Sequence, residues 1–154
     1  LTIFSGDCLP VFLYDPVRRV IAACHAGWRG TAQGIAAQAA RQMQEDYGCA
    51  PQDILAAIGP GIGPCCFETH ADVPDGLRAE LGPDAEAFIT ALPGGEKFQV
   101  DLKGANARWL ERAGLKPEHI ALSAACTACD RTDFWSHRMQ GSQRGSMAAI
   151  IQMV

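Results

Sequence analysis

The segment LPVFLYDPVRRVIAAC, residues 9–24, contains two short apolar runs separated by a turn. The first run covers residues 9–14 and ends at the turn dipeptide Asp15-Pro16, and the second covers residues 20–24. Short apolar runs bounded by turn residues are typical of buried strands. We therefore predict that the two runs form a hairpin of buried strands.

The apolar pattern changes to helical spacing after the hairpin. Residues 31–47 predict a helix with Thr31 as its N-cap, and residues 73–81 predict a shorter helix. Asp101 is expected to cap a helix that runs to residue 114. Further strands are predicted at residues 1–4, 54–59, 98–100, 120–125 and 147–154, and a long polar loop at residues 126–146.

Strands and helices alternate along the chain, and strand pairs stand at its beginning and its end. This order predicts an α/β fold with a mixed β-sheet core and helices packed outside, with ligands at the strand ends. The length of 154 residues suits a single domain, expected over residues 1–154. Because the chain opens at Leu1 directly in a strand and without a methionine, we expect an excerpt whose N-terminal segment is missing.

The composition argues against several function classes. The net charge is -4 and Lys and Arg do not cluster, so we expect no nucleic-acid partner. No apolar stretch approaches membrane-spanning length and no signal peptide opens the chain, so we expect a soluble, cytoplasmic monomer or homodimer with a small-molecule substrate. Seven cysteines, an odd number, fit reduced thiols better than a secreted disulfide framework.

Cys8 and His25 each lie next to a strand of the predicted hairpin, in SGDCLPV and CHAGWRG. Their spacing allows both side chains to meet at one end of the hairpin. A thiolate and an imidazole are ligands for zinc or copper, and they are equally a nucleophile and its base. The alternative is that Cys8 is a buried apolar residue and His25 a hydrogen-bonded turn residue.

The GWRG loop predicts an anion site. It brings Arg29 and Gly30 to the start of the helix predicted at Thr31, where unpaired backbone N–H groups and the helix dipole attract an anion. We therefore predict a phosphate-binding site at Arg29, Gly30 and Thr31. The alternative is an ordinary glycine-rich connection with an exposed arginine.

A polar cluster lies in the long loop near the end of the chain. It consists of four polar residues under the aromatic cover of Phe134 and Trp135, namely Ser136, His137, Arg138 and Arg144. Such a cluster suits a base or a ribose, so we take Ser136, His137 and Arg138 as candidate substrate-binding residues. A solvated surface loop is the alternative.

The remaining loop cysteines carry no predicted site. Adjacent Cys65 and Cys66 cannot easily point into one site, so at most one would be functional, and packing is the favoured use of both. Cys126 and Cys129 form a C-x-x-C pair without the second pair that a structural zinc site needs. We interpret them as reduced loop cysteines.

The motifs GDCLPV, AACHAGWRG, IGPGIGPCCFE, ACT and FWSHR occur in this order, and together they resemble the YfiH-like family. That family was once named for a laccase or multicopper polyphenol oxidase domain and is now assigned as purine nucleoside phosphorylase. The resemblance runs from Thr2 nearly to Val154. It implies the YfiH-like fold, which resembles that of a bacterial toxin deamidase.

The resemblance implies one metal ion, zinc with copper as the alternative, held by a cysteine and two histidines. Cys8 matches the ligand cysteine, and His25 matches a ligand histidine in the motif that also holds Arg29. The family's other ligand histidine belongs to a Q-V-H motif upstream of DCLPV, which this chain does not contain. Near the end, the family's T-G-R pattern reads QRGS, where Arg144 stands only approximately in place of the usual arginine.

The activity that the resemblance implies is phosphorolysis of adenosine, inosine or methylthioadenosine to a free base and ribose 1-phosphate. Hydrolytic deamination of adenosine is the companion reaction. In this hypothesis, phosphate binds at Arg29 and the helix start, ready to attack the sugar carbon. A metal ion at Cys8 and His25 would polarise the substrate or lower the pKa of a bound water.

Three other functions compete with this one. A copper oxidase is rejected, because four histidines, with His70 and His119 in polar surroundings, cannot populate imidazole-rich copper centres. A cysteine hydrolase or deamidase, with Cys8 as nucleophile and His25 as base, is the first alternative. A non-enzymatic domain that binds a nucleoside or a partner is the second.

Overall fold

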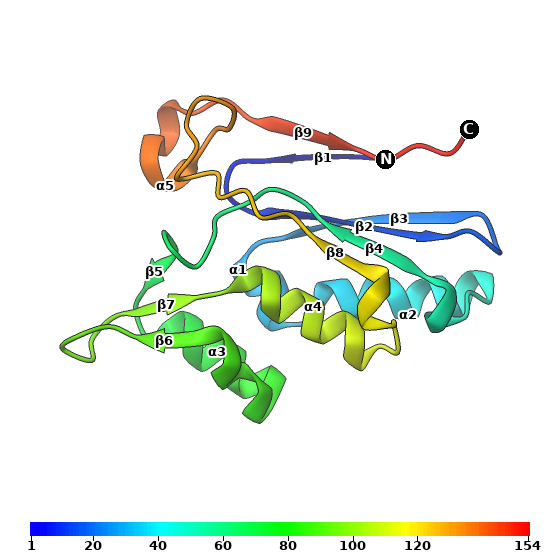
Figure 1. The fold of residues 1–154 in the computed structure, drawn as a ribbon, viewed down its shortest axis with the longest axis horizontal. Helices are drawn as coiled ribbons and strands as arrows, with labels where there is room; N and C mark the ends of the chain where they lie inside the picture. Colours follow the sequence, from blue (N-terminus) through cyan, green and yellow to red (C-terminus); the bar gives the residue numbers. More distant parts are fainter.

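A four-stranded mixed sheet forms the centre of the structure, a computed structural model that describes all of residues 1–154 (Figure 1). Its strand order is β3-β2-β4-β8, with the bounds Val20–Ala26, Leu9–Asp15, Leu55–Ile58 and Ile120–Leu122. β2 is antiparallel to both β3 and β4, whereas β4 and β8 run parallel. The predicted hairpin and the predicted mixed sheet are confirmed.

Helices cover one face of this sheet, and a two-stranded ribbon lies over the other (Figure 1). The helices are α1, Trp28–Ala32, α2, Ile35–Tyr47, and α4, Leu102–Arg112. The ribbon pairs β1, Thr2–Ser5, with β9, Met147–Ile150, in antiparallel register. The first and last segments of the chain therefore lie side by side.

A third, smaller sheet extends from one end of the central sheet. Its strand order is β5-β7-β6, with the bounds Glu68–Thr69, Phe98–Val100 and Ile89–Ala91, and α3, Asp72–Leu81, packs beside β7. The last helix, α5, is His137–Gln140, and it lies beyond the ribbon, above β5 in Figure 1. Short 3-10 segments complete the fold at Pro51–Asp53, Gly82–Phe88, Pro117–His119 and Gly141–Gln143.

The strands thus divide into three sheets, whereas the alternation of elements predicted one mixed sheet. A period-two pattern shows that a segment is extended and which face is buried, but it does not identify the partner strand. The pairing of β1 with β9 joins the two ends of the chain, so it depends on the packing of everything between them. Helices outside a mixed sheet are nevertheless confirmed.

The hydrophobic core lies between the central sheet and the helices. Leu9, Val11 and Leu13 alternate along β2, and each is 0% exposed. Ala36 and Ala40 of α2 belong to the same buried cluster. Their small side chains let the helix backbone approach the sheet closely, and close packing of this kind makes the register of β2 difficult to change.

The helix predicted over residues 31–47 is two helices, because the chain turns at Gly34. Gly34 has a φ of 71°, and a Cβ there would lie 3.0 Å from Cδ2 of Trp109 in α4. Glycine therefore permits both the left-handed backbone and the contact with the indole ring. The prediction that Thr31 is an N-cap is wrong: Thr31 lies inside α1, which begins after Gly27.

Asp101 caps α4 as predicted, since its Oδ1 accepts hydrogen bonds from Lys103 N at 3.0 Å and Gly104 N at 3.1 Å. Three strand predictions were too long: β4 is Leu55–Ile58, β8 ends at Leu122 and β9 ends at Ile150. Element boundaries depend on the tertiary partners of the last residues, which local patterns do not report.

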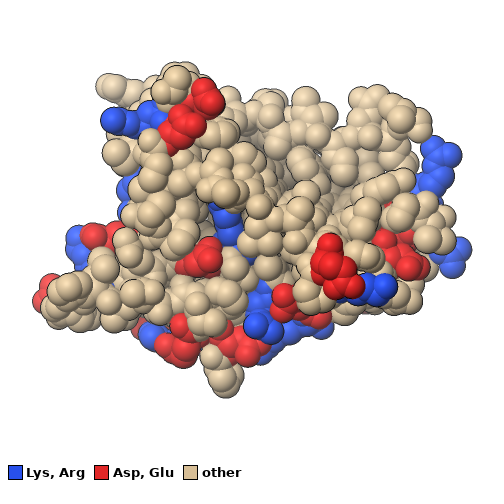
Figure 2. All heavy atoms as spheres, in the orientation of Figure 1, with Lys and Arg blue, Asp and Glu red and all other residues tan.

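Charged groups are dispersed over the surface. On the face shown in Figure 2, Lys and Arg side chains lie among Asp and Glu side chains, mainly along the lower edge and the sides. Surface ion pairs include Arg78 with Glu86 at 2.7 Å and Arg112 with Asp84 at 3.0 Å. No helix of the structure combines the length and the apolar character needed to cross a bilayer.

Asp15 closes the turn of the β2–β3 hairpin from within the protein. The residue is 0% exposed, and its Oδ1 accepts hydrogen bonds from Val17 N at 2.8 Å and Arg18 N at 2.9 Å. Burial raises the pKa of Asp15, but hydrogen bonds from these amides and from the Cys49 thiol outweigh burial and lower the pKa below its ordinary value. The charged form is therefore the stabilising one.

Replacing Asp15 with asparagine removes the charge and keeps one oxygen acceptor. Because the folded-state pKa lies below the unfolded value of about 3.9, the carboxylate stabilises the fold above about pH 4. This contribution is lost as the pH falls through the folded-state pKa. Asp15→Asn should lower the free energy of unfolding by about 1–3 kcal/mol at pH 7 and by less at pH 3. Urea unfolding at both pH values measures the difference, and an equal loss at the two would contradict a role for the charge.

Candidate active site

One pocket, of about 340 Å³, opens at the edge of the central sheet where β2 begins and β3 and β4 end. Its wall comes from segments far apart in the sequence. The polar and aromatic residues that line it are Asp7, Cys8, Trp28, Phe67, His137, Arg138 and Arg144. Three predicted site residues, Cys8, His137 and Arg138, thus lie on one pocket wall.

Asp7 joins three of these segments. Its Oδ1 accepts a hydrogen bond from Thr127 Oγ1 at 2.6 Å, and its Oδ2 accepts one from Arg138 N at 2.6 Å. The backbone of Asp7 has a φ of 86°, a left-handed conformation that costs energy for any residue with a side chain. The two short hydrogen bonds hold this conformation, so the Cys8 loop is attached to both the Thr127 loop and α5.

Two guanidinium groups line the pocket without a carboxylate partner. Arg138 Nη1 donates to Glu68 O at 2.7 Å, and the guanidinium lies 5.4 Å from the centre of the Phe67 ring. Arg144 Nη1 donates to Gly145 O at 2.7 Å. None of the ion pairs of the structure includes either arginine. Both positive charges are therefore free to bind an anionic ligand.

Gly6 provides the room in which the Arg144 guanidinium lies. A Cβ at Gly6 would be 2.6 Å from Arg144 Nη1 and 2.7 Å from its Cζ, well inside contact distance. Any side chain at position 6 would therefore displace the guanidinium. The position of this cation depends on a glycine that is distant from it in sequence.

Cys8 lies half-buried on the pocket wall, close to Gly27, where a Cβ would lie 3.1 Å from Cys8 Sγ. Burial raises the pKa of the Cys8 thiol, Asp7 raises it further, and Arg144 acts in the opposite direction. A thiol with a raised pKa is a poor nucleophile at neutral pH, because the reactive form is the thiolate. This environment argues against the cysteine-hydrolase alternative.

His25 lies on β3 directly opposite Pro10 of β2. Pro10 is two residues after Cys8 in the chain. The two predicted ligands thus belong to the same end of the hairpin, although His25 is exposed and is not part of the pocket wall. A sulfur and an imidazole suit zinc, but zinc sites in enzymes use three protein ligands. No third His, Cys, Asp or Glu of residues 1–154 completes a group with this pair.

The phosphate-binding site predicted at Arg29, Gly30 and Thr31 is not part of this pocket. α1 has only five residues and begins at Trp28, so Thr31 does not stand at a helix start. The hydroxyl of Thr31 is 0% exposed and accepts a hydrogen bond from Asn106 Nδ2 at 2.8 Å. Arg29 stacks on the ring of Trp28 at 4.2 Å and lines a separate hollow, and Gly30 packs against Ile35.

Ser136 is buried at 0% exposure and caps α5, with its Oγ accepting a hydrogen bond from Met139 N at 3.3 Å. It therefore orients the helix that carries His137 and Arg138 to the pocket. The loop that the sequence pattern predicted over this region contains this short helix. Trp28, Phe67 and Asp7 were missed as pocket residues, because nothing local distinguishes them from core or turn residues.

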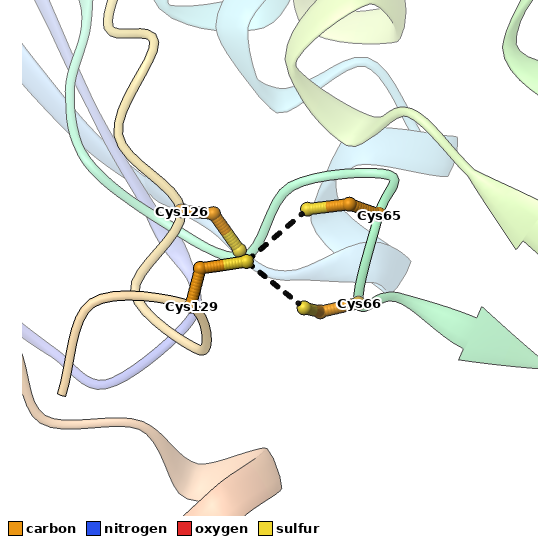
Figure 3. A group of neighbouring side chains, drawn as sticks. All are labelled: Cys65, Cys66, Cys126 and Cys129. Atoms are coloured by element: carbon orange, nitrogen blue, oxygen red, sulfur yellow. Dashed lines mark hydrogen bonds between the residues drawn. The ribbon is translucent and has the colours of Figure 1, made fainter.

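Four cysteines from two loops converge on one another, as Figure 3 shows. Cys129 Sγ lies 3.6 Å from Cys65 Sγ and 3.4 Å from Cys66 Sγ. All four sulfur atoms, including that of Cys126, lie within 4.8 Å of one another. This arrangement corrects the interpretation of these residues as separate packing and loop cysteines.

Cys65 and Cys66 both face the cluster because they lie in a turn. Cys66 N and Phe67 N donate to Gly63 O, each at 3.0 Å, so the backbone curves around the two thiols. Only in an extended strand must successive side chains point to opposite sides. The signal in the sequence was that both cysteine pairs follow predicted strands, but it did not show that those strands are parallel neighbours.

The pKa of Cys126 lies below its ordinary value. Burial raises it, but backbone N–H groups of Gly63, Cys129 and Ala128 stabilise the thiolate and lower the pKa to about 7. The Gly63 amide donates to Cys126 Sγ at 3.2 Å. At least one sulfur of the cluster is thus surrounded by donors that favour its charged form.

Comparison with known proteins identifies relatives along the whole chain. Residues 1–154 match the family model described as multi-copper polyphenol oxidoreductase laccase. The chain is 40% identical over 152 residues to the purine nucleoside phosphorylase YlmD of Geobacillus stearothermophilus, covering 98% of this chain and 55% of that protein. It is 33% identical over 141 residues to the adenosine deaminase RL5 of an unknown prokaryotic organism, covering 92% and 53%.

The fold has a solved counterpart. The crystal structure of the Bacillus licheniformis hypothetical protein YfiH matches with a TM-score of 0.92 at 37% sequence identity, over 96% of this chain and 55% of that chain. The predicted YfiH-like fold is therefore confirmed. The chain spans about half the length of the relatives it matches.

The environment of Cys8 predicts slow alkylation. Because burial and Asp7 disfavour the thiolate, iodoacetamide should modify Cys8 at pH 7.5 more slowly than it modifies glutathione, and the rate should still rise above pH 9. Mass spectrometry of the Cys8 peptide across a pH series, in metal-free protein, measures this rate. Rapid, saturable modification with a midpoint below pH 8 would instead support a nucleophilic cysteine.

Proposed function

Because this chain belongs to the multi-copper polyphenol oxidoreductase laccase family, we propose that the protein is a purine nucleoside phosphorylase, with adenosine deamination as a companion reaction. Its proposed substrates are phosphate and adenosine, inosine or methylthioadenosine. Enzymes that act on purine nucleosides are among its relatives by name, which supports this class of activity.

The observation that carries the proposal is the composition of the pocket wall. A nucleoside phosphorylase must bind an anion and an aromatic base next to each other. Arg138 and Arg144 supply two cations free of carboxylates, and Trp28 and Phe67 supply aromatic surface. Guanidinium groups bind phosphate oxygens in pairs, and aromatic rings stack on bases. The pocket volume of about 340 Å³ is in the range of small-molecule sites.

In the proposed reaction, Arg138 and Arg144 hold phosphate beside the sugar carbon C1′. A phosphate oxygen forms a bond to C1′ while the bond from C1′ to the purine nitrogen breaks, and the base leaves with the electron pair. His137, the imidazole on the pocket wall, donates a proton to the departing base. Most of the rate gain comes from orientation and from the fixed positive charges.

Cys8 and His25 are the proposed ligands of a zinc ion, because a sulfur and an imidazole suit zinc; the family description itself names copper. Zinc bound there would supply Lewis-acid chemistry and lower the pKa of a water, which hydrolytic deamination requires. The half-buried thiol fits this role, because a metal ion stabilises the thiolate that burial disfavours. The structure supplies two such donors, so a further ligand from outside residues 1–154 is part of the proposal.

The alternatives make opposite predictions. A nucleoside-binding domain without activity would bind inosine and release no base. A cysteine hydrolase would act without phosphate and would lose activity on alkylation of Cys8. Phosphate dependence of product formation therefore separates the three functions.

Incubation of the full-length protein with inosine and phosphate is the direct test. Chromatography should show hypoxanthine and ribose 1-phosphate only when phosphate is present. Cys8→Ala and His25→Ala should each reduce turnover to background, whereas His70→Ala, an exposed histidine outside the pocket, should keep it. Release of no base from any purine nucleoside would refute the proposed function.

The Gly6–Arg144 contact makes a second prediction. Gly6→Ala should raise the KM for phosphate about tenfold, because one charged hydrogen bond contributes about 1.5–3 kcal/mol. The KM for inosine should change little. In an Arg144→Ala background the same Gly6→Ala change should have no further effect, since the group it displaces is gone. Additive losses in the double variant would show that Gly6 acts through something other than Arg144.

A further inference from the structure

The two cysteine loops lie side by side because β4 and β8 are parallel neighbours in the sheet. Parallel strands end at the same edge, so the segment after β4 and the segment after β8 start together. A bridge joins Gly61 to Cys126, and Thr127 N donates to Gly61 O at 3.2 Å. The Cys65-Cys66 pair and the Cys126-x-x-Cys129 pair are thereby brought together by backbone pairing.

We propose that Cys65, Cys66, Cys126 and Cys129 bind one zinc ion in a structural site that fastens the loop after β4 to the loop after β8. The site is separate from the proposed ligands Cys8 and His25. It uses two cysteine pairs, one adjacent and one with the C-x-x-C spacing. Binding deprotonates the thiols and releases their protons.

The sulfur positions match a tetrahedron around a metal ion. With a zinc–sulfur bond of about 2.3 Å, the edges of a tetrahedral site are about 3.8 Å long. The separations from Cys129 Sγ are 3.6 Å to Cys65 Sγ and 3.4 Å to Cys66 Sγ, and no pair in the cluster exceeds 4.8 Å. Small shifts of the sulfur atoms would bring all the separations to those of a tetrahedral zinc site.

Four thiolates in a tetrahedron select zinc or iron over metals that prefer oxygen ligands. A [4Fe–4S] cluster binds each cysteine to a different iron, and a [2Fe–2S] cluster binds two cysteines to each of two irons. Both place sulfurs on different irons farther apart than these four sulfurs lie. Disulfides would join the sulfurs in pairs at about 2.05 Å, and two of them would be needed to use all four thiols. A single ion with four ligands satisfies all four residues at once.

The backbone around the cluster supports a thiolate site. Gly63 N donates to Cys126 Sγ at 3.2 Å, which orients the sulfur and stabilises its negative charge. A Cβ at Gly63 would lie 3.3 Å from both Cys65 Sγ and Cys126 Cβ. Glycine at this position leaves the inside of the turn free, so that the two loops can approach.

A buried cation lies beside the cluster without a carboxylate partner. Lys103 is 6% exposed, and its Nζ donates to Ser123 O at 2.8 Å and Ala125 O at 2.6 Å. Burying a lysine without a counter-charge is unfavourable. Cys126, Asp101 and Cys65 are near enough to favour its charged form, although none of them forms an ion pair with it. A zinc ion with four thiolates carries two negative charges, and it would add to the counter-charge near Lys103.

The proposed ion would stabilise the pocket wall. Phe67 follows Cys66 directly and lines the pocket, and Thr127 follows Cys126 and donates to Asp7. Arg138 Nη1 also donates to Cys66 O at 3.3 Å. The zinc site therefore lies one residue from two of the contacts that shape the pocket.

Metal analysis of the full-length protein tests the proposal. The Cys8→Ala variant, which removes a ligand of the other proposed site, should retain about one equivalent of zinc. X-ray absorption of that zinc should show four sulfur ligands at about 2.3 Å and no nitrogen. Cys126→Ser and Cys129→Ser should each lose this equivalent, whereas Cys24→Ala, a buried cysteine outside the cluster, should keep it.

A measurement on the wild-type protein covers the case in which the serine variants fail to fold. Replacement of zinc with Co²⁺ should produce the intense visible bands and the thiolate-to-metal charge-transfer band of a tetrahedral sulfur site. Removal of zinc with a chelator should lower the midpoint of thermal unfolding, and added Zn²⁺ but not Mg²⁺ should restore it.

Several results would overturn the zinc site: four free thiols with no bound metal, a disulfide within the cluster, iron in place of zinc, or a mixed sulfur and nitrogen ligand set in the Cys8→Ala variant. These outcomes are independent of the proposed function. A protein that holds the four-sulfur zinc ion but does not cleave inosine would refute the proposed function alone. A protein that cleaves inosine without this ion would refute the zinc site alone.

Discussion

The register of the central sheet is the constraint on which the rest of the structure depends. β2 runs antiparallel to β3 and β4, and β8 runs parallel to β4, so the start of β2 and the ends of the other three strands share one edge. A one-residue slip would turn Leu9, Val11 and Leu13 away from the core, and their complete burial shows how strongly the register is specified. Cys8, Trp28 and the two cysteine loops all extend from this edge.

Asp7 holds together the loops that form the pocket at this shared edge. Its carboxylate is buried, but hydrogen bonds from Thr127 and from the backbone of Arg138 satisfy both oxygens, so the charge is tolerated inside the protein. Its oxygens are occupied by these neutral donors, and neither Arg138 nor Arg144 forms an ion pair with a carboxylate. Asp7 thus holds three loops together, and the pocket keeps two cations that are free to bind an anion.

Local sequence patterns predicted most of the individual helices and strands, but they did not predict the contacts between segments that are distant in the sequence. The β2–β3 hairpin and the Asp101 cap depend on neighbouring residues, so they were readable in advance. The break at Gly34 was not, because it depends on the Trp109 ring from a distant helix. Likewise, the anion site expected at Arg29 assumed a long helix that starts at Thr31, whereas α1 starts at Trp28 and has only five residues.

The sequence by itself determined the alternation of strands and helices, the existence of the hairpin, the family resemblance and the nomination of Cys8, His137 and Arg138. These are properties of short segments, since burial and capping follow from spacing along the chain. Only the tertiary structure decided that four cysteines from two loops meet, that Asp7 joins three segments, and that Gly6 makes room for Arg144. Each of these contacts joins residues separated by dozens of positions, and strand pairing, which no local pattern encodes, brings them together.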